Sequence, residues 1–137
     1  MLSFTLNEYV KREASKLRYE IKDIAPSSID EVIRNYHERG IVTVWSGASD
    51  ATIFGDASVN YAFRAWHDLT HILTGNNFTL QGETITALHQ IATLPQGIAR
   101  IVLIEVIGQA SHYFQHGHFP SNQIHFTMDA LKRGDYV

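Results

Sequence analysis

Apolar residues recur every three or four positions along most of the chain, which is the spacing of amphipathic helices. Residues that favour helix starts, such as Ser28 and Thr79, and residues that favour helix ends, such as Gly40 and Gly75, bound these stretches. The pattern predicts helices over about 6–24, 29–39, 59–73, 80–93, 96–116 and 123–132. We therefore expect an all-α fold, in which residues 1–137 form a single domain of about six helices in an irregular bundle.

Residues 41–45 (IVTVW) depart from this pattern, because their β-branched and aromatic side chains are typical of a strand. No partner strand is evident in the sequence, so we expect an extended segment packed against the helices. The loop that follows, residues 46–58, leads directly into the third helix. Within this loop, Asp50 and Asp56 are expected to cap a helix or bind water, although they also qualify as outer groups of a metal site.

The composition is that of an ordinary globular domain, with 45% hydrophobic and 18% charged residues among 137. A net charge of -3 gives no general attraction to nucleic acid, so no nucleic-acid partner is expected. Because the chain has no cysteine, a metal site must use nitrogen and oxygen ligands. The N-terminal stretch lacks the apolar core of a signal peptide, and no run is apolar for long enough to span a bilayer. A cytoplasmic protein without a transmembrane segment is expected.

The most distinctive stretch contains His67, Asp68, His71 and Glu83, which follow the pattern HDxxH-x11-E. Two histidines four residues apart lie on one face of a helix, and Asp68 borders the same face. The chain reverses after Gly75, so Glu83, in the first turn of the next helix, can return toward the histidines. With this spacing, one helical turn offers two imidazoles to a divalent metal ion, and a carboxylate from the following segment would add an oxygen ligand. The alternative is a helix whose two histidines face water.

A second set of polar residues lies in the long helix. Glu105 stands in an apolar stretch (IARIVLIEVIG), where a carboxyl group is rarely buried without a partner. Glu105, Gln109 and His112 share one helical face, which could meet the histidine face and supply outer partners or a further ligand. Arg64, just upstream of the motif, joins this outer set. The alternative is a salt bridge from Glu105 to Arg64 or Arg100.

The same motif resembles the signature of the Coq4 family of ubiquinone-biosynthesis proteins. Its four positions correspond to His67, Asp68, His71 and Glu83, and the flanking LTG after His71 and TLP at residues 93–95 are also similar. The resemblance covers residues 61–95. It implies an all-helical fold in which the four residues are metal ligands. It also implies an apolar groove for a prenyl tail and a role in modifying the quinone ring, so an isoprenoid quinone precursor or a similar apolar small molecule is the expected partner.

Two imidazoles and two carboxylates suit zinc first, and also iron, manganese or, less well, magnesium. HDxxH also differs by one methylene group from the HExxH helix of zinc peptidases, so a zinc-dependent hydrolase with Asp68 as general base is one alternative. Another alternative is a non-catalytic binding or scaffold module in which the metal fastens two helices together. Peripheral membrane association and a homo-oligomer are compatible with each of these.

Overall fold

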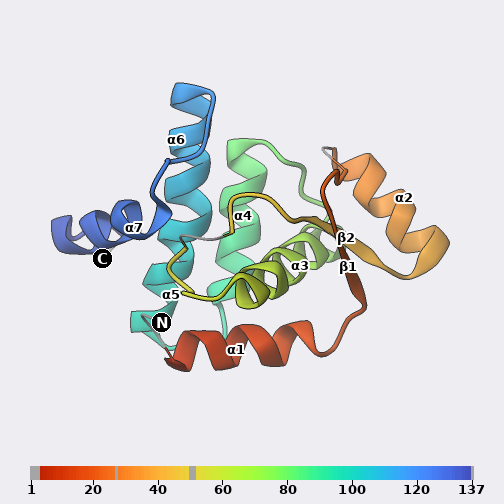
Figure 1. Ribbon diagram of the computed structural model, residues 1–137, viewed down its shortest axis with the longest axis horizontal. Coiled ribbons are helices and arrows are strands. Elements are labelled where there is room, and N and C mark those ends of the chain that lie inside the picture. The colour runs from red at the N-terminus through yellow and green to blue at the C-terminus, as the bar shows by residue number, and fades with distance from the viewer. Residues whose placement is uncertain (1–3, 27, 50–51, 137) are drawn as a thin grey trace.

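Helices make up most of the structure, a computed structural model that describes residues 4–26, 28–49 and 52–136 (Figure 1). The elements in chain order are α1 (Phe4–Ala14), β1 (Tyr19–Lys22), α2 (Ile29–Arg39), β2 (Val42–Trp45), α3 (Ala57–Thr74), α4 (Leu80–Ile91), α5 (Gln96–Leu103), the π-helical segment η1 (Ile104–Gly108), α6 (Gln109–His116) and α7 (Gln123–Arg133). Because α5, η1 and α6 follow one another without a break, the described residues form six helices. The prediction of an all-α fold with about six helices is confirmed.

The local sequence signals set the helix ends as expected. The side chains of Ser28 and Thr79 each accept a backbone N–H from the first turn of α2 and α4. Gly40 and Gly75 end α2 and α3 with φ values of 65° and 72°, the left-handed region that glycine adopts without steric cost. Asp56 caps α3, and Asp50 lies outside the described residues.

The first predicted helix is too long. A helix over 6–24 was expected, but α1 ends at Ala14, and the chain becomes the strand β1 at Tyr19. Leu17 and Tyr19 pack against a small buried group that contains Val42, Val44 and Ala65. This long-range packing, together with the strand hydrogen bonds, overrides the helical spacing of the local sequence.

The second correction concerns residues 41–45, which were expected to have no partner strand. β2 pairs in parallel with β1, with Tyr19 opposite Val42 and Lys22 opposite Trp45. The partner was missed because its sequence had been assigned to the first helix. Three of the four β2 residues are buried, and β2 packs against α3.

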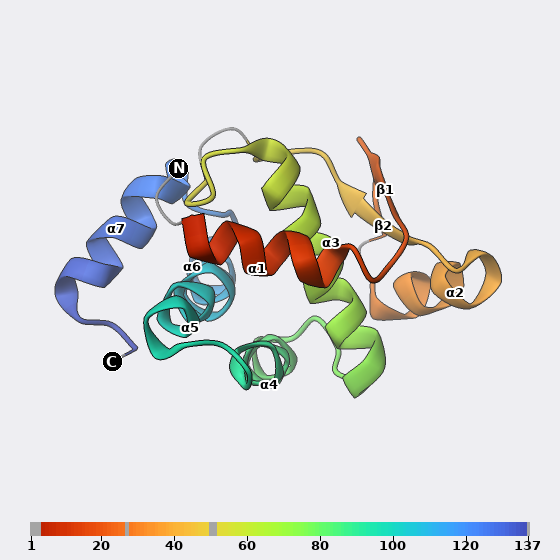
Figure 2. The same ribbon diagram turned by 90° about the horizontal axis from the view of Figure 1, so that it is seen from below.

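The main core lies between α1, α3, α4 and α5. Leu6 and Val10 of α1 are fully buried, and they belong to the same apolar group as Phe63 and Trp66 of α3. Figure 2 shows α1 lying across α3, while α4 and α5 are seen nearly end-on along one side of α1. The helix α3, which carries the predicted histidines, is therefore held by packing on several sides.

The long helix over 96–116 has the expected extent but not the expected regularity. Its middle, η1, is π-helical and contains Glu105, and it is followed by α6, which ends at Gly117. A π-helical turn inside an α-helix is rare and is often associated with a functional site. Among the described residues, the helices lack the length and apolar character needed to cross a membrane.

Candidate metal centre

The turn between α3 and α4 brings the two ends of the predicted motif together. Gly82 makes this possible, because a Cβ atom at this position would lie 2.0 Å from the backbone oxygen of Asn77. Only glycine allows the first turn of α4 to approach the preceding turn so closely. Glu83, the next residue, is thereby placed opposite the face of α3 that carries His67 and His71.

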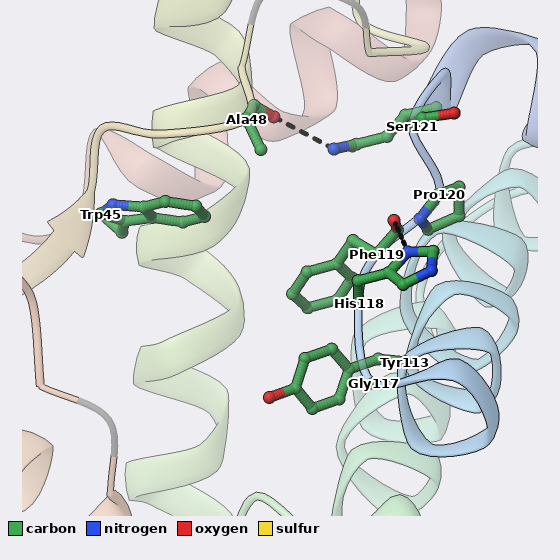
Figure 3. A pocket seen from close by; sticks show the side chains of 9 residues that line it. Trp45, Ala48, Tyr113, Gly117, His118, Phe119, Pro120 and Ser121 are labelled. Carbon is green, nitrogen blue, oxygen red and sulfur yellow. Dashed lines mark hydrogen bonds between the residues drawn. The ribbon is translucent and has the colours of Figure 1, made fainter.

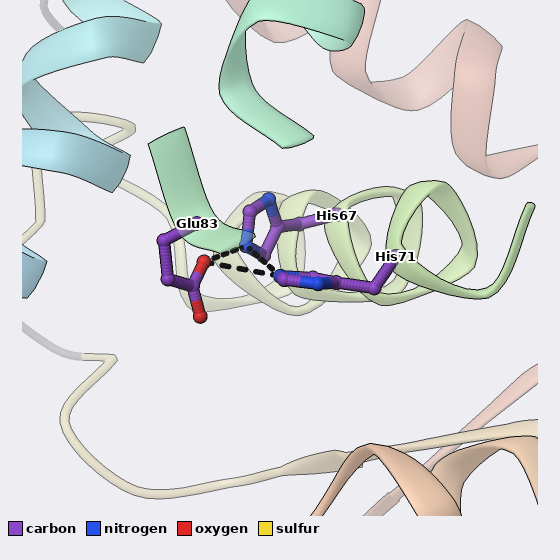
Figure 4. Close-up of side chains that lie close together, drawn as sticks. All are labelled: His67, His71 and Glu83. Carbon is purple, nitrogen blue, oxygen red and sulfur yellow. Dashed lines mark hydrogen bonds and ion pairs between the residues drawn. The ribbon is translucent and has the colours of Figure 1, made fainter. Parts of the chain in front are cut away.

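Three side chains converge at this point, and we call them the His–Glu cluster: His67, His71 and Glu83 (Figure 4). The Oε2 atom of Glu83 lies 2.6 Å from His67 Nε2 and 3.1 Å from His71 Nε2, and the two Nε2 atoms are 3.1 Å apart. The side chain of His71 is fully buried, and those of His67 and Glu83 are 14% and 17% exposed. Solvent therefore does not reach the cluster from the side of His71, but it reaches the cluster beside His67 and Glu83.

Hydrogen bonds on the far side of each imidazole decide which ring nitrogen carries the proton. His71 Nδ1 lies 2.9 Å from the backbone oxygen of Asn76, and His67 Nδ1 lies 2.6 Å from the side-chain oxygen of Gln90. Since both oxygens are acceptors, each Nδ1 donates its proton outward. A neutral ring then directs its Nε2 lone pair toward the Glu83 carboxylate, whereas a protonated ring donates its Nε2–H to the carboxylate.

The charges within the cluster favour an ionised carboxylate. Burial raises the pKa of Glu83, but hydrogen bonds with His67 and His71 outweigh it and bring the pKa down to about 2. Burial also lowers the pKa of His67, yet the hydrogen bond and negative charge of Glu83 raise it overall. Glu83 is therefore ready to serve as an anionic ligand at neutral pH.

Either a proton or a metal ion can supply positive charge between these three atoms. A proton on His67 Nε2 satisfies the contact with Glu83 but not those of His71 Nε2, whereas a metal ion would contact all three atoms. Ligand atoms on one tetrahedral zinc ion lie roughly 3.3 Å apart, so a small opening of the cluster accommodates zinc. The donor set of two nitrogens and one carboxylate oxygen fits zinc, iron or manganese.

Asp68, the fourth predicted ligand, does not belong to the group of ligand atoms that lie within 4.8 Å of one another. Burial raises the pKa of its carboxyl group to about 6, although the nearby His67 and His71 lower it. The structure thus places Asp68 beside the cluster, on the helix α3 that carries His67 and His71. Its carboxyl group accepts no hydrogen bond from the described residues.

The predicted outer residues Arg64 and His112 have their hydrogen bonds elsewhere. The Arg64 guanidinium donates to the backbone oxygens of Trp45, the last residue of β2, and of Gly47 and Ala48 in the loop after it. His112 Nδ1 donates to the backbone oxygen of His118, near the end of α6. In the described part of the chain, neither forms a hydrogen bond with the cluster.

Glu105 has neither of the expected partners. Its carboxyl oxygens accept hydrogen bonds from Thr127 of α7 at 2.6 Å and from Gln109 of α6 at 2.8 Å. The alternative of a salt bridge to Arg64 or Arg100 is wrong, because Arg64 donates to backbone oxygens at and after the end of β2 and Arg100 donates to the backbone oxygens of Leu131 and Asp135. Burial raises the pKa of Glu105 to about 7, despite these two hydrogen bonds, which lower it.

Three partners of the histidines were not identified from the sequence: Gln90, Thr86 and the backbone oxygen of Asn76. On α4, Thr86 and Gln90 follow Glu83 at spacings of three and seven residues, so all three share one face. Both Thr86 and Gln90 are buried. Polar residues at this spacing on an otherwise apolar helix face could have identified Thr86 and Gln90 from the sequence. The backbone carbonyl of Asn76 could not be identified in this way, because every residue has one.

Comparisons with protein-family models, curated proteins and solved structures find no match to this chain.

Proposed function

We propose that this protein binds a divalent metal ion, zinc first, through His67 Nε2, His71 Nε2 and Glu83 Oε2. The observation that carries the proposal is the convergence of these three lone-pair donors, with both Nδ1 protons directed away from the cluster. A metal bound by three protein ligands keeps a position for water or substrate, which is typical of catalytic sites rather than structural ones.

We further propose that the metal serves the handling of an apolar small molecule, such as an isoprenoid quinone precursor. This part rests on the resemblance of residues 61–95 to the Coq4 family. A bound divalent ion would polarise an oxygen atom of the ligand or acidify a water molecule. The chain's own contribution is to hold the ligand atoms in place and to keep Asp68 beside them.

A zinc-dependent hydrolase is the second candidate, and the position of Asp68 favours it. The carboxyl group lies outside the group of ligand atoms and next to His67 in the sequence, as a general base beside a zinc ion would. β2 packs against α3, so a strand lies beside the motif helix. The two candidates share the metal and differ in the molecule on which it acts.

Elemental analysis of the purified, untagged protein tests the metal site directly. We expect about one equivalent of a transition metal in the parent and in His89→Ala, a control because His89 is exposed on α4. His71→Ala and Glu83→Ala should each lose it. If the parent stays empty after incubation with zinc, iron and manganese, the proposal is wrong. If the metal is retained but no position exchanges with small ligands, the site is a structural fastening of α3 to α4.

A further inference from the structure

A groove separate from the His–Glu cluster opens between the end of β2 and the segment that links α6 to α7 (Figure 3). Its volume is about 590 Å³, within the roughly 300–1,000 Å³ of most small-molecule sites. None of the three cluster residues lines it. We call it the aromatic groove, because Trp45, Tyr113 and Phe119 form its walls.

These three aromatic side chains are unusually exposed for their size. Trp45 is 44% exposed, Tyr113 is 42% exposed and Phe119 is 45% exposed. Figure 3 shows Trp45 on one side of the groove and Phe119 and Tyr113 on the other. Large apolar groups from distant parts of the chain thus share one concave surface, which is a mark of a binding site.

The Trp45 wall is fixed in position from behind. A Cβ atom on Gly47 would lie 2.1 Å from the indole ring, so one face of the indole rests on the glycine backbone. The guanidinium of Arg64 stands 5.4 Å from the ring centroid and holds the backbone of the same loop. Trp45 thus packs against Gly47 and Arg64 and still stays 44% exposed.

The loop at the end of the groove is held in a strained conformation. Ala48 has a φ of 52°, which an alanine rarely adopts. Its backbone oxygen accepts hydrogen bonds from Arg64 of α3 and from Gln123 of α7, two helices far apart in the sequence. Strained residues held by surrounding donors are concentrated at binding sites, where they preorganise the walls.

The opposite wall is a pair of rings. The centroids of Tyr113 and Phe119 lie 4.9 Å apart, with their planes inclined by 31°. The Tyr113 hydroxyl points into the groove in Figure 3, and it forms no hydrogen bond within the described part of the chain. No lysine, arginine, aspartate or glutamate is among the described residues that line the groove.

We propose that the aromatic groove binds a neutral, planar aromatic ring, placed between Trp45 and the Tyr113–Phe119 pair. Aromatic faces favour stacked or edge-on contacts with a flat ring over contacts with a puckered aliphatic one. The absence of charged lining residues favours a neutral ring, and the Tyr113 hydroxyl provides one polar contact. The site is independent of the metal, and its existence does not depend on the function proposed above.

Two probes of similar size test the role of the flat ring: 2-naphthol and its saturated counterpart, decahydro-2-naphthol. Calorimetric titration of the 137-residue protein should give binding of 2-naphthol that is roughly tenfold tighter than that of decahydro-2-naphthol, since two aromatic walls contribute. The same result is expected for His71→Ala, which separates this site from the metal centre. Absence of 2-naphthol binding, or equal binding of the two probes, contradicts the proposal.

Matched variants locate the site. Trp45→Leu and Phe119→Leu keep apolar bulk but remove a ring, and each should weaken 2-naphthol binding by roughly twofold to tenfold. Phe114→Leu is the control, because Phe114 is exposed on α6 but does not line the groove. Amide chemical shifts in each folded variant show whether 2-naphthol still perturbs residues around Ala48. Equal affinities across the three variants would place the ring elsewhere and overturn the assignment.

Discussion

Glu83 and Glu105 are two largely buried glutamates whose surroundings have opposite effects. Glu83 faces two histidine nitrogens, and its pKa falls to about 2. Glu105 accepts hydrogen bonds from the neutral side chains of Thr127 and Gln109, and its burial raises its pKa to about 7.

The difference lies in what remains unsatisfied around each carboxyl group. Around Glu105, each carboxyl oxygen already has its own donor, so the arrangement joins η1 to α6 and α7 and needs nothing further. Around Glu83, both neighbouring rings donate their Nδ1 protons away from the carboxylate, so positive charge at Nε2, from a proton or from a metal ion, is what satisfies the contacts. A buried carboxylate therefore indicates a site only when its neighbours are lone-pair donors as well.

The largest expected contrast between the two glutamates is their effect on stabilisation by zinc. Zinc that binds only the folded state should raise the free energy of unfolding by about 4 kcal/mol when its free concentration is about 1,000 times the dissociation constant. We expect this gain in the parent and in Glu105→Gln but not in Glu83→Gln, measured by thermal unfolding with and without zinc. Equal gains in both variants would remove the distinction between the two sites.

The second contrast is the pH dependence that Glu105 confers. Its pKa is about 7 in the folded state against 4.5 for a free side chain, so the folded protein keeps a proton that the unfolded chain releases between these values. The free energy of unfolding should therefore fall as pH rises from 4.5 to 7, by about 3 kcal/mol, and then level off.

Urea unfolding of the metal-free parent and of Glu105→Gln, at about pH 5 and about pH 8, measures this slope. Glutamine fills the same space but does not titrate. The free energy of unfolding of Glu105→Gln, relative to that of the parent, should therefore increase with pH. A difference that stays constant between the two pH values would show that Glu105 is not held in its protonated form by burial.

The partners of the histidines should have a smaller effect than the ligands themselves. Gln90→Leu removes the acceptor for His67 Nδ1 and frees the ring to change tautomer, so zinc affinity should fall by about 10- to 100-fold. Gln81→Leu, on the exposed face of the same helix, is the matched control. Competition with a chromogenic chelator measures the zinc affinity of both variants. Similar affinities would show that Gln90 does not hold the His67 ring in the orientation and tautomer that bind zinc.

The smallest expected effect concerns the turn that places Glu83. Gly82→Ala puts a methyl group against the Asn77 backbone, so it should destabilise the fold by about 1–2 kcal/mol and weaken zinc binding. Gly97→Ala is the control, since nothing lies within 4 Å of its added Cβ in α5. This control should be neutral or slightly stabilising. If chemical unfolding shows Gly82→Ala to be as stable as Gly97→Ala, the close approach does not position the site.

Local signals in the sequence accounted for most of the helix boundaries. Helix caps act through their immediate neighbours in the chain, so their positions can be predicted from sequence. Examples are the N-caps Ser28 and Thr79 and the C-caps Gly40 and Gly75. The approach of Glu83 to His67 and His71 was likewise predictable, because it depends on one helical spacing and one short turn. Whether these residues bind a metal stays a prediction.

Features that depend on distant residues were not predictable in this way. β1 was assigned to a helix because its partner β2 lies more than twenty residues away, and pairing overrides the local periodicity. The sequence left the partner of Glu105 open between the histidine face and an arginine, because its hydrogen bond to Thr127 depends on how α7 packs, which no local pattern encodes. The aromatic groove likewise joins Trp45 to Phe119 across most of the chain.

The most direct test of the central claim is a crystal structure of the zinc-loaded protein, with anomalous scattering measured at the zinc edge. We predict one strong peak within about 2.0–2.2 Å of His67 Nε2, His71 Nε2 and a Glu83 carboxylate oxygen. The position of the Asp68 carboxyl group relative to that peak would show whether it is a ligand or a neighbouring base. A peak only among the exposed histidines near the end of α6, or no peak at all, would contradict the account.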